Sequence, residues 1–471
     1  MVKLFREKKD MGSPKIQNFK RQTVLHKGQR TRLPATYIAP EDVSIWDIIR
    51  PNLGKDFSRF TVPVFMNEPL SFLQRLSENV QYNYLLEKAA KCSDDMERIE
   101  FYEFRFFFNW KKLKHQMKLS NSAHKTGFTF ANSINYVAAF ALATVSANHK
   151  RLSKPFNPLL LETFELERNG VRFLAEQVSH HPPISAVYAE SDEFTVEGTV
   201  EPTLGFWMTK LLANPHAHLK LTFKKTGETY SWSAPKCAIY NVIMGKMYMN
   251  FTSHMKIESS GTYDAVFSFD NKGYYNHKGG DVHVEGHIFE GKNKIKALYG
   301  NWTLFLASCD NEDFKHHRKE YLRMFNETVS EKDQGPVVPG SKILWVSNQI
   351  PKLFDDQFHF TNFTLSLNEM YPGMSDTVAP TDSRRRKDMK ALEDGKNDEA
   401  EEFKHKYEEE QRERRTTKTG DVPMWFAKND EGHWAYKGGY WDRDYSNCLE
   451  LFESLENSST NSSNSSISSV D

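Results

Sequence analysis

The chain has 471 residues, of which 39% are hydrophobic and 26% charged, and its 62 basic residues balance its 62 acidic ones. This length allows one large domain or two ordinary ones, each with a substantial buried core. The charge balance argues against wholesale nucleic-acid binding, and the polar composition excludes an integral membrane protein.

The four cysteines, Cys92, Cys237, Cys309 and Cys448, are far apart and show no paired spacing. This pattern predicts neither a disulfide framework nor a zinc site, so we expect no metal, no cofactor and a reducing compartment. The first residues lack the apolar segment of a secretory signal. We therefore expect the protein in the cytosol.

A basic arm opens the chain. Residues 1–32 carry ten lysines and arginines against Glu7 and Asp10, a net charge of +8 from ten minus two. We expect residues 1–40 to be a solvated, disordered tail. The sharper alternative is contact with an anionic membrane, where each basic residue contributes about 1 kcal/mol.

Three apolar patterns then predict helices. Val43–Leu53 is a short amphipathic stretch that Pro51 ends, and Pro69–Leu76 begins with a proline at the expected helix start. Tyr136–Ala147 is apolar on nearly every side, so we expect it to be buried, and it is too short to span a bilayer.

From Phe164 to about Leu306 the chain changes to short alternating runs separated by turn residues. Asn169-Gly170 lies between two such runs and is a strong hairpin signal. The cadence predicts an antiparallel meander in a sandwich or barrel, hence a β-dominated α+β fold. Closure removes sheet edges, and a barrel wider than about eight strands leaves an interior that side chains do not fill. An internal cavity is therefore expected.

The last part of the chain changes character again. No glycine or proline interrupts Glu399–Arg415, which predicts a long exposed helix, and the aromatic stretch Trp425–Tyr445 predicts a packed C-terminal segment. Ser454–Val470 is a low-complexity run that cannot bury a core. We therefore assign residues 448–471 to a disordered Ser/Asn-rich tail.

The string EQVSHHPP at Glu176–Pro183 is the most unusual in the chain. Because a residue before proline is restricted to extended backbone, both imidazoles are expected to project from a strand end toward one ligand. The alternative is a pair of ordinary polar residues at a strand end. Metal binding needs three or four ligands, and general base catalysis needs an orienting carboxylate and a nucleophile; neither set accompanies the histidines. We expect no enzyme activity.

EQVSHHPP resembles the signature of the oxysterol-binding protein family. Other segments agree with it: NEPLSFLQR at 67–75, KPFNPLL at 154–160, NVIMGK at 241–246, VEGHI at 284–288 and PGSKILW at 339–345. The resemblance covers roughly Ser44–Asn447 and implies one lipid-transfer domain over 41–447. It implies a near-complete antiparallel barrel around an apolar tunnel, an N-terminal lid, a C-terminal helical segment and a basic rim that grips a phosphoinositide headgroup.

The resemblance carries the headgroup-binding role to Lys154, His180, His181, Lys404, Glu408 and Arg412. The last three also share one face of the predicted helix, since they are four and eight residues apart. The alternative for that face is an ordinary solvated ladder of ion pairs. The lid corresponds to about Val43–Leu53, with Ile45, Trp46 and Ile49 against the sterol; a core helix is the competing interpretation.

Three features depart from the family pattern. Leu161 replaces a glycine that is usual in the family and that often permits close approach of backbone to phosphate. Residues 383–388 read SRRRKD where SRLRPD is usual, and residues 101–133 are an atypical insertion. The string Glu100–Glu103 faintly resembles a motif that tethers relatives to the endoplasmic reticulum, and it lacks the later acidic position.

The resemblance implies a peripheral protein that exchanges a sterol and phosphatidylinositol 4-phosphate between anionic membranes at contact sites. Phosphatidylserine is an alternative second cargo. A sterol-dependent sensor or scaffold is an alternative of another class, and a hydrolase that uses His180 or His181 is a third. Nucleic acid is not an expected partner.

Overall fold

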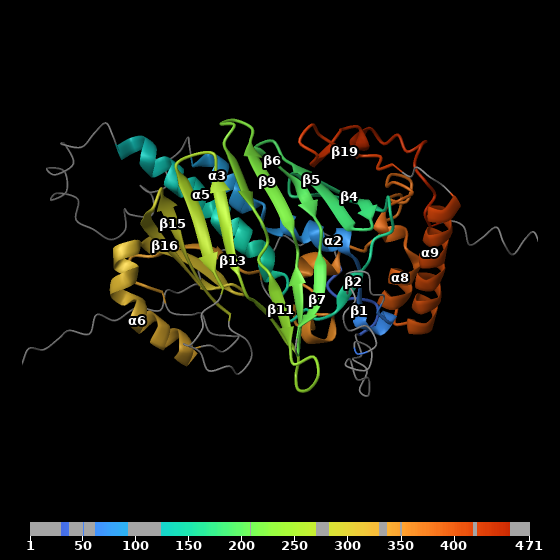
Figure 1. The fold of residues 1–471 in the computed structure, drawn as a ribbon, viewed down its shortest axis with the longest axis horizontal. Coiled ribbons are helices and arrows are strands. Elements are labelled where there is room, and N and C mark those ends of the chain that lie inside the picture. Colours follow the sequence, from blue (N-terminus) through green and yellow to red (C-terminus); the bar gives the residue numbers. More distant parts are fainter. Residues whose placement is uncertain are drawn as a thin grey trace, which may run out of the picture.

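The computed structural model of the chain describes residues 30–36, 50, 62–92, 124–207, 209–269, 282–328, 337–348, 351–417 and 422–452. A long curved sheet occupies the centre of the molecule, with α6 at one end and α8 and α9 at the other (Figure 1). The predicted lid, including Ile45, Trp46 and Ile49, lies outside the described residues. So do residues 1–29 and 37–40 of the basic arm, residues 453–471 of the C-terminal tail and residues 101–123 of the insertion. Within the two segments predicted as disordered, Leu33, Leu451 and Phe452 are described and are buried.

The main sheet has twelve antiparallel strands, which confirms the β-dominated class. Within the described residues the sheet is not closed, because its outer strands β3 and β18 do not pair with each other. The segment at Thr381 covers the edge of β3, where the amide of Thr163 donates to its carbonyl at 2.9 Å. In spatial order, the strands are β18 (Lys342–Val346), β17 (Phe305–Asp310), β16 (Asn293–Asn301), β15 (His283–Glu290), β14 (Tyr263–Ser268), β13 (His254–Ser259), β10 (Thr229–Trp232), β9 (Ala217–Phe223), β6 (Phe194–Val200), β5 (Pro183–Glu190), β4 (Val171–His180) and β3 (Thr163–Arg168).

The predicted Asn169-Gly170 hairpin is confirmed as the β3–β4 turn. Both residues have positive φ, +53° for Asn169 and +74° for Gly170. A two-residue turn of this kind matches the twist of the strands that it joins, and asparagine and glycine adopt it most readily.

A second, four-stranded sheet extends four strands of the first. Its strand order is β12-β11-β8-β7. In the chain these strands are next to β13, β10, β9 and β6, respectively, and those four strands are neighbours in the main sheet in the same order. Four central strands therefore continue past a break and project beyond the main sheet (Figure 1). Their bounds are Thr203–Trp207 for β7, Lys210–Asn214 for β8, Cys237–Tyr240 for β11 and Tyr248–Phe251 for β12.

Helices from the first third of the chain pack into the interior of the sheet. The buried core joins alternate residues of the strands with α2 (Phe72–Ser77), η5 (Glu78–Tyr82), α3 (Tyr84–Lys91) and α5 (His124–Ser146). The predicted burial of the alanine-rich helix is confirmed, since residues such as Ala141 and Leu142 have no exposed surface. The helix begins twelve residues before Tyr136, so the end of the atypical insertion is helical.

The prediction that a helix opens at Pro69 was wrong. Pro69 lies in β1 (Asn67–Ser71), which pairs in parallel with β2 (Lys154–Phe156), and α2 begins at Phe72. Ser71 caps that helix: its hydroxyl accepts from the amide of Leu73, and the side chain of Gln74 accepts from the amide of Ser71. This capping box fixes the start of the helix after the proline.

The C-terminal part forms a layer at the β3–β4 end of the sheet. The predicted long helix is confirmed as α9 (Asn397–Thr417), but it is not exposed throughout, because Ala400, Lys404 and Tyr407 are buried. The helix α6 (Asn311–Thr328) was not predicted. The predicted packed aromatic segment is confirmed, since Trp425, Phe426 and Tyr440 are buried against β4 and β5. Besides α9, this layer contains the following elements of the C-terminal part: η7 (Phe354–Asp356), α7 (Asn362–Leu365), η8 (Ser383–Arg385), α8 (Lys387–Glu393), β19 (Phe426–Lys428), β20 (Trp434–Tyr436) and η9 (Tyr440–Asp442). One element from the start of the chain, η4 (Val64–Met66), joins them.

All four cysteines are free thiols. Among the described residues, no group of three or more metal-ligating side chains is arranged to hold an ion. No described helix combines the length and the apolar character that a bilayer-crossing segment needs.

Candidate functional site

The two histidines of the EQVSHHPP string lie at the turn between β4 and β5. His180 is the last residue of β4 and Pro183 the first of β5, so His181 and Pro182 form the turn. The rings of His180 and His181 are 4.6 Å apart between centroids. His180 is half-buried and His181 is exposed. The expectation that both imidazoles sit at a strand end is confirmed, and Pro183 begins the next strand.

A glutamine of α9 holds His180 in place. The side-chain amide of Gln411 donates to Nε2 of His180 at 2.7 Å, and its Oε1 accepts from the backbone amide of Leu160 at 2.8 Å. Burial, followed by the nearby charges of His181 and Arg415, lowers the pKa of His180 to about 4. The imidazole is therefore neutral at physiological pH and available to a ligand as a hydrogen-bond partner.

The first two residues of the string serve the architecture. The carboxylate of Glu176 accepts from three successive backbone amides of the C-terminal segment, those of Met424, Trp425 and Phe426, at 2.7 to 3.2 Å. Gln177 joins the two strands next to the turn, because its Oε1 accepts from the hydroxyl of Ser185 at 2.6 Å. The histidine turn is thus fixed at its base by buried hydrogen bonds.

Lys154 lies at the start of β2, next to α9. The side chain of Asn67 in β1 donates to the backbone carbonyl of Lys154 at 2.9 Å and so fixes the position of that strand. Burial and the positive charge of Lys404 lower the pKa of Lys154 to about 8, while Glu408 opposes the shift. A half-buried cation beside a second cation is a favourable place for an added anion.

The three residues predicted on one face of α9 differ in their exposure. Lys404 is buried, and its ammonium group donates to the carbonyl of Val62 and to Glu401 at 3.3 Å. Glu408 is half-buried near Lys154, and Arg412 is exposed. The headgroup-binding role of these residues remains a prediction, and Lys404 also holds the segment before β1.

Two residues of the site were missed in the sequence. Gln411 contacts His180, and the charge of Arg415 acts on it. Both follow Lys404 at helical spacings of seven and eleven, so the same face that led to Glu408 contains them. The helical spacing that indicates Gln411 was present in the sequence, but a single uncharged glutamine among many ionic residues gave no reason to predict a binding role.

Leu161 occupies a left-handed backbone conformation, with φ of +70°. A side chain in this region costs roughly 1–2 kcal/mol, and glycine, the residue that the resemblance implies here, would avoid that cost. The side chain is nevertheless buried, with 8% of its surface exposed, and its amide donates to the carbonyl of Gln177 at 3.0 Å. Leucine therefore keeps the loop in the shape that the hydrogen bond requires.

The neighbouring Glu162 connects three parts of the site. Its fully buried carboxylate accepts from Ser71 at 2.5 Å, from Ser383 at 2.6 Å and from Arg386 at 2.8 Å. It also accepts from the amide of Leu159 at 2.9 Å. The segments NEPLSFLQR, KPFNPLL and SRRRKD, distant in sequence, are thereby held together beneath the histidine turn.

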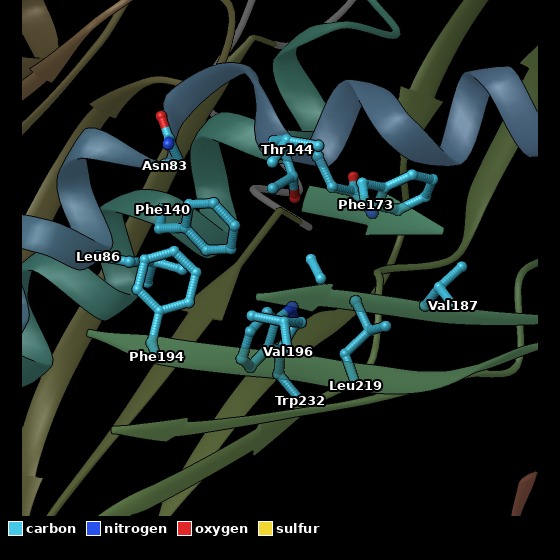
Figure 2. Close-up of a pocket in the computed structure, with 13 residues that line it drawn as sticks. Asn83, Leu86, Phe140, Thr144, Phe173, Val187, Phe194, Val196, Leu219 and Trp232 are labelled. Carbon is cyan, nitrogen blue, oxygen red and sulfur yellow. The ribbon is translucent and has the colours of Figure 1, made fainter. Parts of the chain in front are cut away.

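The interior of the sheet contains an apolar cavity of about 30 Å³. Phe140 of α5 and Leu86 of α3 face Phe194, Val196 and Trp232 of the sheet across it (Figure 2). Small-molecule sites usually occupy about 300–1,000 Å³, so this cavity is too small for a lipid, and within the described residues α3 and α5 pack against the sheet around it. Phe173, which also lines the cavity, precedes His180 by seven residues on β4, or about 23 Å of strand.

Comparison with known proteins agrees with this architecture. The family model described as oxysterol-binding protein matches residues 44–116 and 110–445. The chain belongs to the oxysterol-binding protein family. It is 35% identical to human oxysterol-binding protein-related protein 1 over an alignment of 458 positions that covers 90% of this chain and 44% of that protein. The chain thus spans less than half the length of that relative.

Other members of the family match along more of their length. Mouse oxysterol-binding protein-related protein 2 is 33% identical over an alignment of 462 positions that covers 90% of this chain and 88% of that protein. The Osh3 ORD of Saccharomyces cerevisiae, solved in complex with PI(4)P, is 31% identical with a TM-score of 0.68, over 89% of this chain and 99% of that one. The Osh1 ORD domain, solved with cholesterol, is 26% identical with a TM-score of 0.68, over 90% and 93%.

Proposed function

We propose that this protein carries a sterol and phosphatidylinositol 4-phosphate alternately in the interior of its sheet and exchanges them between membranes. No bond is made or broken, so the protein is a carrier and not an enzyme. It acts from the cytosol on the surfaces of anionic membranes. The relatives solved with PI(4)P and with cholesterol support the choice of cargo.

One observation carries the proposal: Gln411 joins the histidine turn to the cationic face of α9, next to Lys154. Lys154, Arg412 and Arg415 offer positive charge to a phosphorylated headgroup, and charge-assisted hydrogen bonds suit such an anion. His180 is neutral and, because its Nε2 accepts from Gln411, its Nδ1–H is the group that can donate at the same place. The headgroup is therefore bound at the rim, while its acyl chains follow the apolar interior.

Cargo entry requires the interior to widen. A hydrocarbon cargo of about twenty carbons gains ~0.8 kcal/mol for each carbon removed from water, which favours separation of the helices from the sheet. The apolar walls at Phe140 and Trp232 would then contact the cargo. Sterol and phosphoinositide compete because both need this one space.

The test is a double variant, His180→Ala with His181→Ala, assayed for extraction of each lipid from liposomes. We expect phosphoinositide extraction to fall by at least about tenfold, since two polar contacts to the headgroup are lost, while sterol uptake persists. The chain supplies a matched control in His316 and His317, another adjacent pair, on α6 with rings 4.7 Å apart. Unchanged phosphoinositide extraction in the first variant would remove the headgroup assignment.

Transport kinetics separate a carrier from a sensor. A carrier moves many labelled lipids per protein from donor to acceptor liposomes, whereas a sensor saturates near one lipid per chain. Mass spectrometry of the recovered lipids should show them uncleaved. A plateau at one lipid per protein would contradict transfer, and a cleaved product would contradict the absence of enzyme activity.

A further inference from the structure

The four-stranded extension ends in a surface that the exchange mechanism does not use. We call it the tip: residues 207 and 209–212 at the β7–β8 turn, and residues 240–248 at the β11–β12 loop. The two turns lie at the same end of the sheet, because β8 and β11 pair antiparallel with Leu211 opposite Ile239. In Figure 1 this end projects at the bottom of the view, whereas the end of β4 faces α9 at the right.

The tip exposes large apolar side chains. Met244 is 85% exposed, Trp207 62%, Ile243 41% and Leu212 37%. These are four of the eight large hydrophobic residues that are exposed in the described part of the chain; the others are Leu353, Met370, Tyr371 and Val422. A cluster of this kind on an otherwise polar surface marks a place of contact.

The loop at the tip is built to hold these side chains outward. Val242 is buried and packs against Phe206, Leu211 and Ile239, while the next two residues, Ile243 and Met244, face solvent. The side-chain amide of Asn241 donates to the carbonyl of Lys246 at 3.0 Å and closes the loop. The exposed pair is thus supported by a small core of its own.

The tip and the four strands that carry it have charges of one sign. Residues 203–214 and 236–251 include Lys210, Lys236 and Lys246 and no aspartate or glutamate, although the whole chain balances 62 basic with 62 acidic residues. Lys210 lies over the ring of Tyr240 at 5.3 Å, and that ring stacks on Tyr248 at 5.0 Å. Tryptophan and tyrosine prefer the bilayer interface, and lysines are attracted to anionic lipid.

We propose that the tip docks on the surface of an anionic lipid bilayer. Trp207, Ile243 and Met244 enter the interfacial region, and Lys210 and Lys246 contact the lipid phosphates. The combination of apolar anchors with lysines and no acidic residue fits a bilayer better than a protein partner, whose interface is usually depleted in lysine. The tip would thereby hold the carrier on a membrane independently of its cargo, which goes beyond the proposed exchange.

Partition of the full chain onto vesicles tests the proposal. The vesicles contain phosphatidylcholine with or without phosphatidylglycerol, and neither sterol nor phosphoinositide, so capture of the proposed cargo does not contribute. We expect Trp207→Ser, Ile243→Ser and Met244→Ser together to lower the partition coefficient by at least about tenfold. The matched control removes Met370, Tyr371 and Val422, also by serine, and should leave partition unchanged. Lys210→Glu with Lys246→Glu should abolish the preference for the anionic vesicles.

The outcomes separate the tip from the exchange site. Equal partition of the tip variant and its control would overturn the proposal, whether or not the protein carries lipid. A wild-type dimer that the tip variant turns into a monomer, with no effect on vesicles, would show a second copy of the chain as the occupant and would also overturn it. If the triple variant does not fold, Met244→Ser alone, at a residue that is mostly solvent-exposed, should still lower partition measurably.

Discussion

Replacing Lys154 by arginine tests the cation of β2 that interacts with Lys404 and Glu408 of α9. The pKa of Lys154 is about 8 in the ligand-free protein because the ammonium group is buried and faces Lys404, with Glu408 in partial opposition. An anionic headgroup favours the protonated form, so binding returns the pKa toward its usual 10.5 and takes up a proton. Arginine stays protonated throughout and removes this linkage.

The sign and size of the effect follow from linkage. Below pH 8 the lysine is protonated in both the free and the bound protein, so affinity does not depend on its titration. Above pH 8 the free protein loses the proton first, and affinity falls by about tenfold per pH unit, reaching roughly thirtyfold at pH 9.5. The usual pKa of an imidazole is about 6.5 and the second pKa of a phosphate monoester is about 6, so neither group changes its protonation between pH 8 and 9.5.

The assay is titration calorimetry with a short-chain, water-soluble phosphatidylinositol 4-phosphate from pH 7.5 to 9.5. Lys154→Arg should retain its affinity across the whole range, with circular dichroism at each pH to show that both proteins stay folded. A flat profile in the wild type, or an equal fall in the arginine variant, would refute the placement of Lys154 against the headgroup.

Three further predictions concern the supporting residues. Glu162→Ala should destabilise the fold by about 3–5 kcal/mol in urea unfolding, because Arg386 and two hydroxyls lose a buried acceptor; an unchanged midpoint would contradict this. Gln411→Ala should weaken headgroup binding by roughly tenfold with little change in stability, since it frees the half-buried His180 from α9. Equal calorimetric affinities of the variant and the wild type would contradict a role of the Gln411–His180 hydrogen bond in binding. Leu161→Gly should lower the melting temperature, because a gain of about 1–2 kcal/mol from the left-handed backbone is smaller than the roughly 2–5 kcal/mol lost with the buried side chain; a higher melting temperature would reverse that balance.

Local turn chemistry and periodicity predicted much of the fold. Asn169-Gly170 marked its hairpin because few other residues adopt the backbone of that turn, and the uninterrupted run Glu399–Arg415 marked α9. Pro69 misled the prediction, because proline is accepted at a helix start and also in the edge strand that it occupies here. The competing signal, the Ser71–Gln74 capping box, was in the sequence two residues later.

The site was harder to predict because its contacts join distant segments. Lys154, His180 and the α9 face were identified through resemblance, and the structure brings them together. Glu176 and Glu162 stabilise the site by hydrogen bonds to residues far along the chain, such as Trp425 and Arg386, and no local sequence pattern indicates these partners. The filled interior likewise depends on how the helices pack against the sheet, which strand periodicity does not describe.

The most direct test of lipid exchange is native mass spectrometry of the protein after incubation with liposomes that contain both cargoes. The account predicts one lipid per chain, either a sterol or a phosphoinositide, with each displaced by an excess of the other. A protein that stays empty, or one that holds both lipids at once, would contradict a single shared site.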